Sequence, residues 1–523
     1  MGALDEQIVE PKRTRNSLLN ASAHVPPEIL GYIFVLSLAA ESNPLYSPHF
    51  PQHFDGLQKG SHNFLLVCHH WFEVAYLTPE VWSFWGNTLQ DWKKRHDRPG
   101  NSLIDLVLDQ RGPGLNFSGS LQGAVRVRAI QNTIRQVHLR SNDTKTLTSI
   151  ILSLTPGDNS EGAQNRNIES IVWETRGIPS IDVSNFFARS NLSKLYLLDI
   201  TGNFRIPSWD PLESKITLLT ALSLRVSESS PPHTPTTSQL FSILTSNPNL
   251  QQLVLSDAAI PDDADRSTLE IPLHNLKLLS LGGKIRPLLG LLRRLILPVT
   301  LDSIGLIAFD STVEDTSQVL GPYMRDYFRR DVRFQDELVV TSIISSHSIA
   351  ITVNTVPISS VPMVTPTFMT VTVVPPFPHT AEQLLIHLFA PIPGETVISL
   401  TTNSITQVQE LLFTMPNIQV LCISNVELSK GFLQPNPDGP HADTKLLPSL
   451  QSLHLGYITL DSDWGHLTTY LAHQTSNDQI ISLTVTGTFP RIDLEVVNEI
   501  KGLVSRFTIM EMPNLEALLP TCN

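Results

Sequence analysis

Cysteine is scarce in this chain of 523 residues, because only Cys68, Cys422 and Cys522 are present, far apart from one another. Three thiols without a Cys-x-x-Cys pair argue against a disulfide framework and against a zinc module built on paired cysteines. The first residues also lack the apolar run of a secretory signal peptide. We therefore expect a reducing compartment, which means the cytoplasm, the nucleus or both.

Charge is also low, since charged residues make up 16 % of the chain and 49 acidic residues stand against 36 basic ones. The formal net charge of -13 argues against general binding to nucleic acid or to an anionic membrane. No apolar run is long enough for a transmembrane helix, because the stretch 29–40 is short and Arg293 and Arg294 interrupt the leucine-rich segment around them. We expect neither a nucleic acid nor a membrane as a partner.

Signatures of common catalytic sites are missing as well. The chain has no G-x-S-x-G, no H-E-x-x-H and no G-x-G-x-x-G, and the Gly-Gly-Lys sequence at 282–284 lacks the upstream glycine of a Walker A loop. The acidic cluster at 262–265 is typical of a solvated turn. We predict a protein that is not an enzyme and that needs no cofactor and no metal.

Composition divides the chain into three zones. Residues 1–24 are polar and are expected to be flexible. Residues 25–98 contain several tryptophans and carry apolar residues at helical spacing, which predicts a small helical domain. From residue 99 to residue 523, short apolar alternations are separated by loops, which predicts short strands.

One pattern recurs in the third zone: an aliphatic residue, a second one three positions later and a third one two positions after that. Clear copies begin at Leu250, Leu276, Ile418 and Leu450. Successive copies between residues 134 and 301 start roughly 24 to 34 residues apart, which overlaps the roughly 20 to 29 residues of a leucine-rich repeat. The last two aliphatic residues lie on the same face of a strand. Stacked repeats bury that face in a parallel sheet.

The repeat is irregular. Ala258 and Lys284 stand where such repeats usually have asparagine or cysteine, and the proline-rich segment 229–238 interrupts the period. Between residues 309 and 397 the pattern cannot be traced. The uncharged span within 337–382 has the Val, Thr, Ser and Pro content of short strands and turns. Ordinary short strands of another α/β fold are the alternative to a repeat array.

The stretch FLLVCHHWFEVAYLTPEVW, residues 64–82, places Cys68 directly before His69 and His70. Adjacent helical residues cannot converge on one metal ion, since ligands on one helix need a spacing of three or four. On a helix Cys68 shares an apolar face with Trp71, and a thiol buried in such a face is unreactive because burial raises its pKa. The stretch therefore predicts a structural cysteine and polar-face histidines.

A second short helix is predicted upstream. Pro26 and Pro27 suit a first helical turn, and Glu28 favours a helix N-terminus. The apolar residues of this helix form one face: Ile29, Leu30, Ile33, Phe34 and Leu36. Two short amphipathic helices with surplus apolar surface usually need a partner.

These pieces together resemble an F-box. The sequence V-P-P-E-I-L at 25–30 with I-F at 33–34 is similar to the first helix of that family, V-C-x-x-W at 67–71 to the second, and P-E-V-W at 79–82 to its end. The resemblance covers roughly residues 25 to 85 and is greatest to the F-box-like proteins of mushroom-forming fungi. The spacer 37–63 is longer than the compact family pattern.

An F-box docks on the Skp adaptor of a Skp–cullin–F-box ubiquitin ligase, and a C-terminal domain, often of leucine-rich repeats, selects the target protein. The resemblance implies that this chain is such a substrate-recognition subunit, with the Skp adaptor, a cullin bound through it and an unknown protein substrate as partners. The residues that would form or support the adaptor interface are Pro26, Ile29, Leu30, Ile33, Val67, Cys68, Trp71 and Trp82. A repeat scaffold that binds proteins without any ligase is the alternative.

The expected fold class is therefore α/β. A small N-terminal helical F-box bundle occupies residues 25–98 in this prediction. An irregular leucine-rich-repeat-like α/β solenoid with a parallel sheet occupies residues 99–523 and recognises the substrate.

Overall fold

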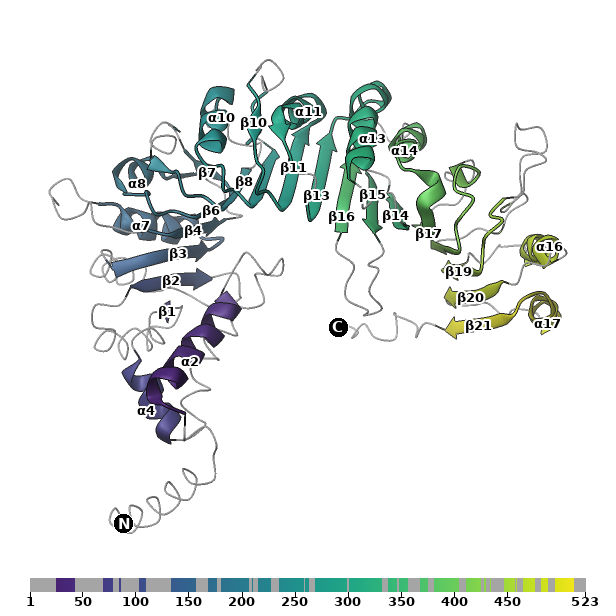
Figure 1. Cartoon of the computed structure of the whole chain (residues 1–523), viewed down its shortest axis with the longest axis horizontal. Coiled ribbons are helices and arrows are strands. Elements are labelled where there is room, and N and C mark those ends of the chain that lie inside the picture. The colour runs from purple at the N-terminus through teal and green to yellow at the C-terminus, as the bar shows by residue number, and fades with distance from the viewer. Residues whose placement is uncertain are drawn as a thin grey trace, which may run out of the picture. The chain divides into compact units, whose positions relative to one another are not determined.

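The computed structural model is a mixed α/β structure in which most strands are parallel (Figure 1). It describes residues 25–42, 69–78, 84–85, 103–109, 133–156, 168–175, 180–206, 209, 215–226, 235–257, 259–262, 269–298, 301–331, 337–345, 348–355, 367–374, 381–403, 411–424, 428, 433, 446–456, 458, 464–475, 481–487 and 494–511. The chain divides into two compact units, Met1–Pro261 and Asp262–Asn523. This division falls inside the segment 99–523, which composition alone treats as one domain.

The first unit contains a parallel sheet in which neighbouring strands follow the order β1, β2, β3, β4, β6, β8, β9. Its strands are β1 (Phe84–Trp85), β2 (Ile104–Asp109), β3 (Ile134–Arg140), β4 (Ser170–Glu174), β6 (Leu197–Gly202), β8 (Ala221–Val226) and β9 (Gln252–Asp257). A short parallel pair joins β5 (Ile181–Asp182) and β7 (Phe204–Arg205). The helices are α2 (Pro27–Ser42), α4 (His69–Leu77), α7 (Thr144–Leu154), α8 (Ser184–Arg189) and α10 (Thr237–Thr245).

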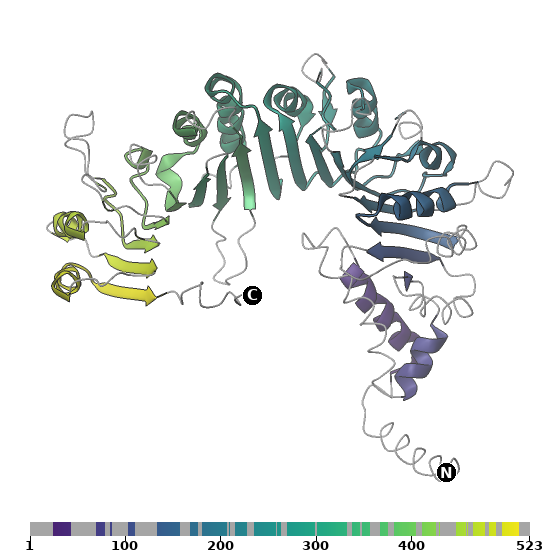
Figure 2. The ribbon, with the colours of Figure 1, turned by 180° about the vertical axis from the view of Figure 1, so that it is seen from behind.

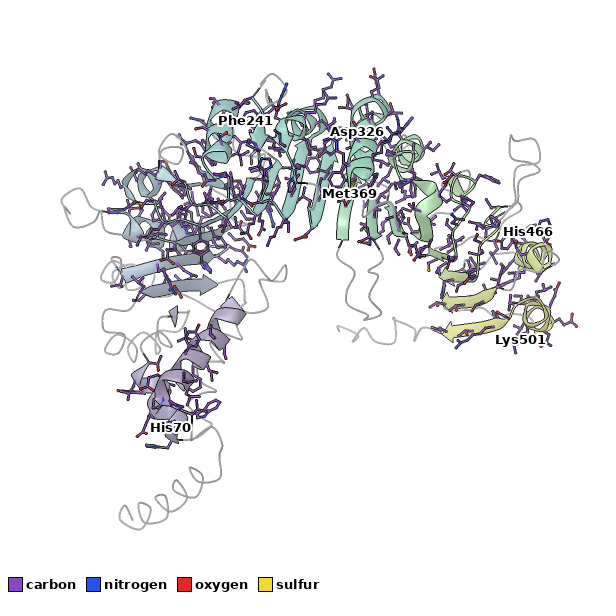
Figure 3. All side chains as sticks on the ribbon, viewed as in Figure 1. His70, Phe241, Asp326, Met369, His466 and Lys501 are labelled. Atoms are coloured by element: carbon purple, nitrogen blue, oxygen red, sulfur yellow. The ribbon has the colours of Figure 1, made fainter. Side chains whose placement is uncertain are left out.

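A row of buried side chains crosses this sheet. Leu139 of β3 is in register with Trp173 of β4, which is in register with Ile200 of β6, and all three are fully buried. Trp173 packs edge-on against Phe186 of α8, with ring centroids 5.0 Å apart. Phe241 of α10 is also buried (Figure 3). The core of this unit therefore lies between the sheet and one layer of helices.

The recurring aliphatic pattern has the predicted geometry. In the copies that begin at Leu250, Leu276, Ile418 and Leu450, all three aliphatic side chains are at most 2% exposed. In each copy the first aliphatic residue donates its backbone N–H to the carbonyl three residues earlier, which forms a turn directly before the strand. The prediction of paired inward-facing side chains on parallel strands is confirmed for these copies.

The second unit contains a sheet in the order β11, β13, β16, β15, β14, β17, β18, β19, β20, β21. Its strands are β11 (Leu278–Lys284), β13 (Ser303–Phe309), β14 (Leu338–Ile344), β15 (Ile349–Thr355), β16 (Thr367–Val373), β17 (Val397–Thr402), β18 (Val420–Ser424), β19 (Ser452–Gly456), β20 (Ser482–Gly487) and β21 (Arg506–Glu511). A short parallel pair joins β10 (Ile271–Pro272) and β12 (Leu295–Ile296).

One layer of helices covers one face of this second sheet, as both ribbon views show (Figures 1 and 2). The helices are α11 (Ile285–Arg294), α12 (Val313–Asp315), the π-helical turn η6 (Thr316–Leu320), α13 (Gly321–Arg330), α14 (Ala381–Phe389), the 3₁₀ turn η9 (Gly394–Thr396), α16 (Trp464–Thr475) and α17 (Leu494–Leu503). Met369 of β16 is fully buried (Figure 3). Within the described part of the chain, no helix is both long and apolar enough to cross a membrane.

An antiparallel meander interrupts the parallel order in the second unit. β14 and β15 are antiparallel, and so are β15 and β16. The three strands lie in the sheet in the reverse of their chain order. The last one, β16, pairs in parallel with β13, and the first one, β14, pairs in parallel with β17. This arrangement explains why the repeat cannot be traced between residues 309 and 397. The short strands expected in the span 337–382 are present as β14, β15 and β16.

Candidate partner-binding surfaces

Helices α2 and α4 pack together through a small apolar core. Leu30 and Phe34 of α2 are buried against Val74 and Ala75 of α4. Trp71, which is partly buried, covers this core, and its ring lies 5.0 Å from that of Phe34 between centroids. The positions 30 and 34 are one helical turn apart, so one face of α2 is used for this packing.

Two polar contacts lie at the ends of this helix pair. The Thr78 hydroxyl donates a hydrogen bond of 2.7 Å to the Val74 carbonyl at the end of α4. Gly31 lies against it, because a Cβ at position 31 would come within 2.8 Å of Thr78 Oγ1. At the other end, Nε2 of His70 is 3.4 Å from the carbonyl oxygen of Val25. The close approach of the helices at Gly31 fits a residue without a side chain.

A second face of α2 is apolar and open to solvent. Its side chains are between 44 and 63% exposed and form what we name the outer stripe: Ile29, Tyr32, Ile33 and Leu36. These positions follow the spacing i, i+3, i+4, i+7, which places them on one side of a helix. An exposed stripe of four large apolar side chains is typical of a surface that binds a partner.

Helix α4 adds further exposed apolar groups. Phe72 and Tyr76 are one turn apart, with stacked rings at a centroid distance of 5.9 Å, and both are about two-fifths exposed. Leu77 at the end of the helix is 76% exposed. These residues, together with Tyr32 and Leu36 of the outer stripe, are absent from the interface predicted by sequence. The helical spacing of Tyr32 relative to Ile29 and Leu36 is a signal that could have identified it.

The predicted interface residues fall into three groups. Pro26, Ile29 and Ile33 are exposed, whereas Leu30 is buried and Trp71 is partly buried. The last two therefore support the helix pair rather than present a free surface. The other predicted residues, Val67, Cys68 and Trp82, lie outside the described residues.

The histidines beside Cys68 have ordinary surroundings. His69 is exposed, and its Nδ1 lies 3.3 Å from a carboxylate oxygen of Glu73, one turn along the helix. His70 is half-buried and contacts the Val25 carbonyl. Among the residues that the structure describes, no group of three or more His, Cys, Asp or Glu side chains could hold a metal ion. Asp262, from the acidic cluster, is exposed and lies 3.7 Å from the Lys284 ammonium.

The described thiol, Cys422 of β18, has no sign of activation. It is half-buried, and burial raises the pKa of the thiol, although a hydrogen bond with Thr401 acts in the opposite direction. Its strand neighbour in register is His454 of β19, whose Nε2 lies 2.9 Å from the Ser452 hydroxyl. A thiol with a raised pKa is a weak nucleophile at neutral pH.

A charged cluster on the first sheet has no counterpart in the sequence prediction. Arg140 of β3 and Glu174 of β4 are in register, and Nε of the arginine lies 3.1 Å from a carboxylate oxygen of the glutamate. Burial raises the pKa of Asp199 on β6, whereas hydrogen bonds from hydroxyls and nearby arginines lower it. One of these hydrogen bonds comes from the Thr201 hydroxyl at 3.2 Å. The cluster links neighbouring strands through opposite charges, which holds their register.

The side chain of His138 on β3 is buried. Burial, with a smaller contribution from the charge of Arg140, lowers the pKa of His138 to about 3. Its Nε2 is 3.0 Å from the hydroxyl of Ser170 on the neighbouring strand. The imidazole is therefore neutral at physiological pH and contributes a hydrogen bond between β3 and β4.

Comparison with known proteins supplies no family. No family model and no curated protein matches this chain. The resemblance to F-box proteins remains a prediction from the residues quoted above.

Proposed function

We propose that this protein is a substrate-recognition subunit of a Skp–cullin–F-box ubiquitin ligase. In this proposal α2 and α4 form the F-box, which docks the Skp adaptor and, through it, a cullin. The two sheet units form an irregular leucine-rich-repeat-like solenoid that binds a target protein. The chain itself carries out no reaction.

The outer stripe is the observation that carries this proposal. The inner face of α2 is already occupied, since Leu30 and Phe34 are buried against α4. The outer stripe leaves a second apolar face in solvent on the segment whose sequence resembles an F-box. Covering it with a partner would remove large apolar side chains from water, each worth about 1.5 to 3 kcal/mol when fully buried.

The sheet units are consistent with a recognition role. Their parallel strands and turns repeat the same aliphatic pattern, which is the arrangement of a stacked binding scaffold. The meander of β14 to β16 is an addition to that pattern, so this part of the second unit differs from its neighbours.

Co-elution with a purified Skp adaptor on a size-exclusion column tests the proposal. We expect the full chain to elute with the adaptor and the double variant Ile29→Asp, Ile33→Asp to elute alone. Both positions are exposed, so the variant should keep the circular dichroism spectrum of the wild type. Leu30 must stay unchanged, because it belongs to the helix-pair core.

Leu152→Asp is the matched control, since Leu152 is an exposed leucine on α7. This variant should co-elute like the wild type. A wild-type chain that elutes apart from the adaptor would favour the alternative, a protein-interaction scaffold that belongs to no ligase.

A further inference from the structure

Four strands of the second unit carry an unbroken row of side chains. Ile343 of β14 is in register with Ala350 of β15, Ala350 with Thr372 of β16, and Thr372 with Ile307 of β13. We name these residues the isoleucine row. The row crosses these strands in the order β13, β16, β15, β14, because the meander pairs β16 with β13 and leaves β14 three strands away from β13.

The isoleucine row lies on the face of the sheet opposite the helices. Ile343 is 57% exposed and Ile307 is 40% exposed, while Ala350 and Thr372 are half-buried. Residues adjacent in sequence point the other way, and Val371 and Val373 on β16 are fully buried. Alternation along the strands therefore separates the core from this open row.

The four strands that carry the row, β13 to β16, contain no charged residue, and the nearest charge on the neighbouring β11, Lys284, lies 3.7 Å from the carboxylate of Asp262. A second row in register lies two residues away from the isoleucine row along each strand: Thr341, Thr352, Thr370 and Gly305. The hydroxyl oxygens of Thr352 and Thr370 are 3.3 Å apart. A charged group pressed against these two rows would lose hydration without gaining an ion pair, which is unfavourable. The chemistry of this surface therefore selects an uncharged partner.

The size of the surface restricts the partner further. Three strand spacings separate Ile343 from Ile307, which is about 14 Å. Two rows, about 7 Å apart along the strands, cover far less than the roughly 800 Å² per partner of a standard stable interface. A second copy of the chain would need much more area, whereas a short peptide segment fits.

We propose that the isoleucine row binds a short, extended and uncharged segment of the target protein. Side chains four residues apart in an extended chain point the same way and lie about 13 to 14 Å apart. Two apolar side chains at that spacing would contact Ile343 and Ile307 together. The inference rests on the proposed function only in identifying the bound protein as a ligase target.

Selection from a phage-displayed library of random octapeptides on the immobilised full chain tests this inference. We expect enriched peptides to be uncharged and to carry two apolar residues four positions apart. Synthetic copies of these peptides, labelled for fluorescence anisotropy, should bind Ile343→Lys and Ile307→Lys at least about tenfold more weakly than the wild type. Ile386→Lys is the matched control, because Ile386 is 42% exposed on α14 in the helical layer.

The control should bind the peptides within about twofold of the wild type. Enrichment of acidic or basic peptides, no enrichment, or equal binding to the Ile343→Lys variant would each overturn the inference. These outcomes are independent of adaptor co-elution, so peptide binding without adaptor binding would reject the ligase proposal alone.

Discussion

The ring of Trp71 packs against the ring of Phe34, with centroids 5.0 Å apart and an interplanar angle of 58°. This contact joins α4 to α2 and completes the cover of Phe34, which has no exposed surface. Ile33, the residue before it, is 44% exposed. A step of one residue turns the helix by about 100°, which is enough to separate a packing face from a binding face.

Phe34 and Ile33 should therefore respond differently to truncation. Phe34→Ala should destabilise the helix pair by about 3 to 4 kcal/mol, because it leaves a cavity beside Trp71. Ile33→Ala should leave the pair intact and weaken adaptor binding. Hydrogen exchange of residues 27–37 and 69–77 measures the first effect, and the adaptor co-elution assay measures the second. Equal loss of exchange protection in both variants would contradict the assignment of the two faces.

Gly31 should not tolerate a larger residue. In Gly31→Ala the new methyl group would meet Thr78 Oγ1 at 2.8 Å, so the Thr78 side chain or the helices must shift. We expect a loss of about 1 kcal/mol or more in the stability of the helix pair. In a Thr78→Ala background the same change should cost less, because the clashing hydroxyl is gone. A double-mutant cycle by hydrogen exchange tests this coupling, and additive effects would argue against it.

Asn247 should stabilise the first unit through three hydrogen bonds between its side chain and the backbone. Its buried amide accepts a hydrogen bond of 2.8 Å from the Leu219 N–H and donates to the carbonyls of Ile216 at 3.1 Å and Ile243 at 2.7 Å. Asn247→Leu should lower the free energy of unfolding by about 2 to 3 kcal/mol, because these backbone groups lose their partner. The exposed Asn185 on α8 is the control, and Asn185→Leu should change stability by less than about 0.5 kcal/mol. Urea denaturation followed by circular dichroism compares them.

His138 should make the first unit sensitive to acid. Its pKa is lowered to about 3 in the folded protein, below the value of about 6.5 for an unfolded chain. Between these pH values the unfolded chain binds a proton that the folded chain does not. The stability from this site is therefore complete above about pH 6.5 and is lost as pH falls toward about 3, with a slope of up to about 1.4 kcal/mol per pH unit.

His138→Gln should remove this slope, so the difference in unfolding free energy between wild type and variant should change across that pH range. Urea titrations at pH 4, 5, 6 and 7 would measure the difference. Parallel curves for the two proteins would mean that the imidazole is not held neutral by burial.

Much of the fold was accessible from the sequence because its signals are local. The spacing of Leu250, Leu253 and Leu255 determines which side chains of β9 point inward, and all three are buried as predicted. The same aliphatic spacing could not be followed between residues 309 and 397. Side chains alternate with a period of two residues in antiparallel and parallel strands alike. The sequence of β14, β15 and β16 therefore does not show which strands they pair with.

The sequence did not determine which apolar face of α2 packs against α4. Apolar spacing predicted one face containing Ile29, Leu30, Ile33, Phe34 and Leu36. The structure divides this set into a buried face and the outer stripe, since α4 packs on one side of α2 only. Hydrophobicity alone does not say which of two adjacent apolar stripes meets another helix.

The sequence by itself determined the strand pattern and the apolar helices, because side-chain alternation and helical spacing follow from backbone geometry. The sequence also predicts that Cys68, His69 and His70 do not converge on a metal ion, because they are adjacent on one helix. Tertiary structure alone decided that Ile343 and Ile307 belong to one open row, although they stand far apart in the chain. That relationship depends on the order of strands in the sheet, which is set by long-range pairing and packing rather than by any local pattern.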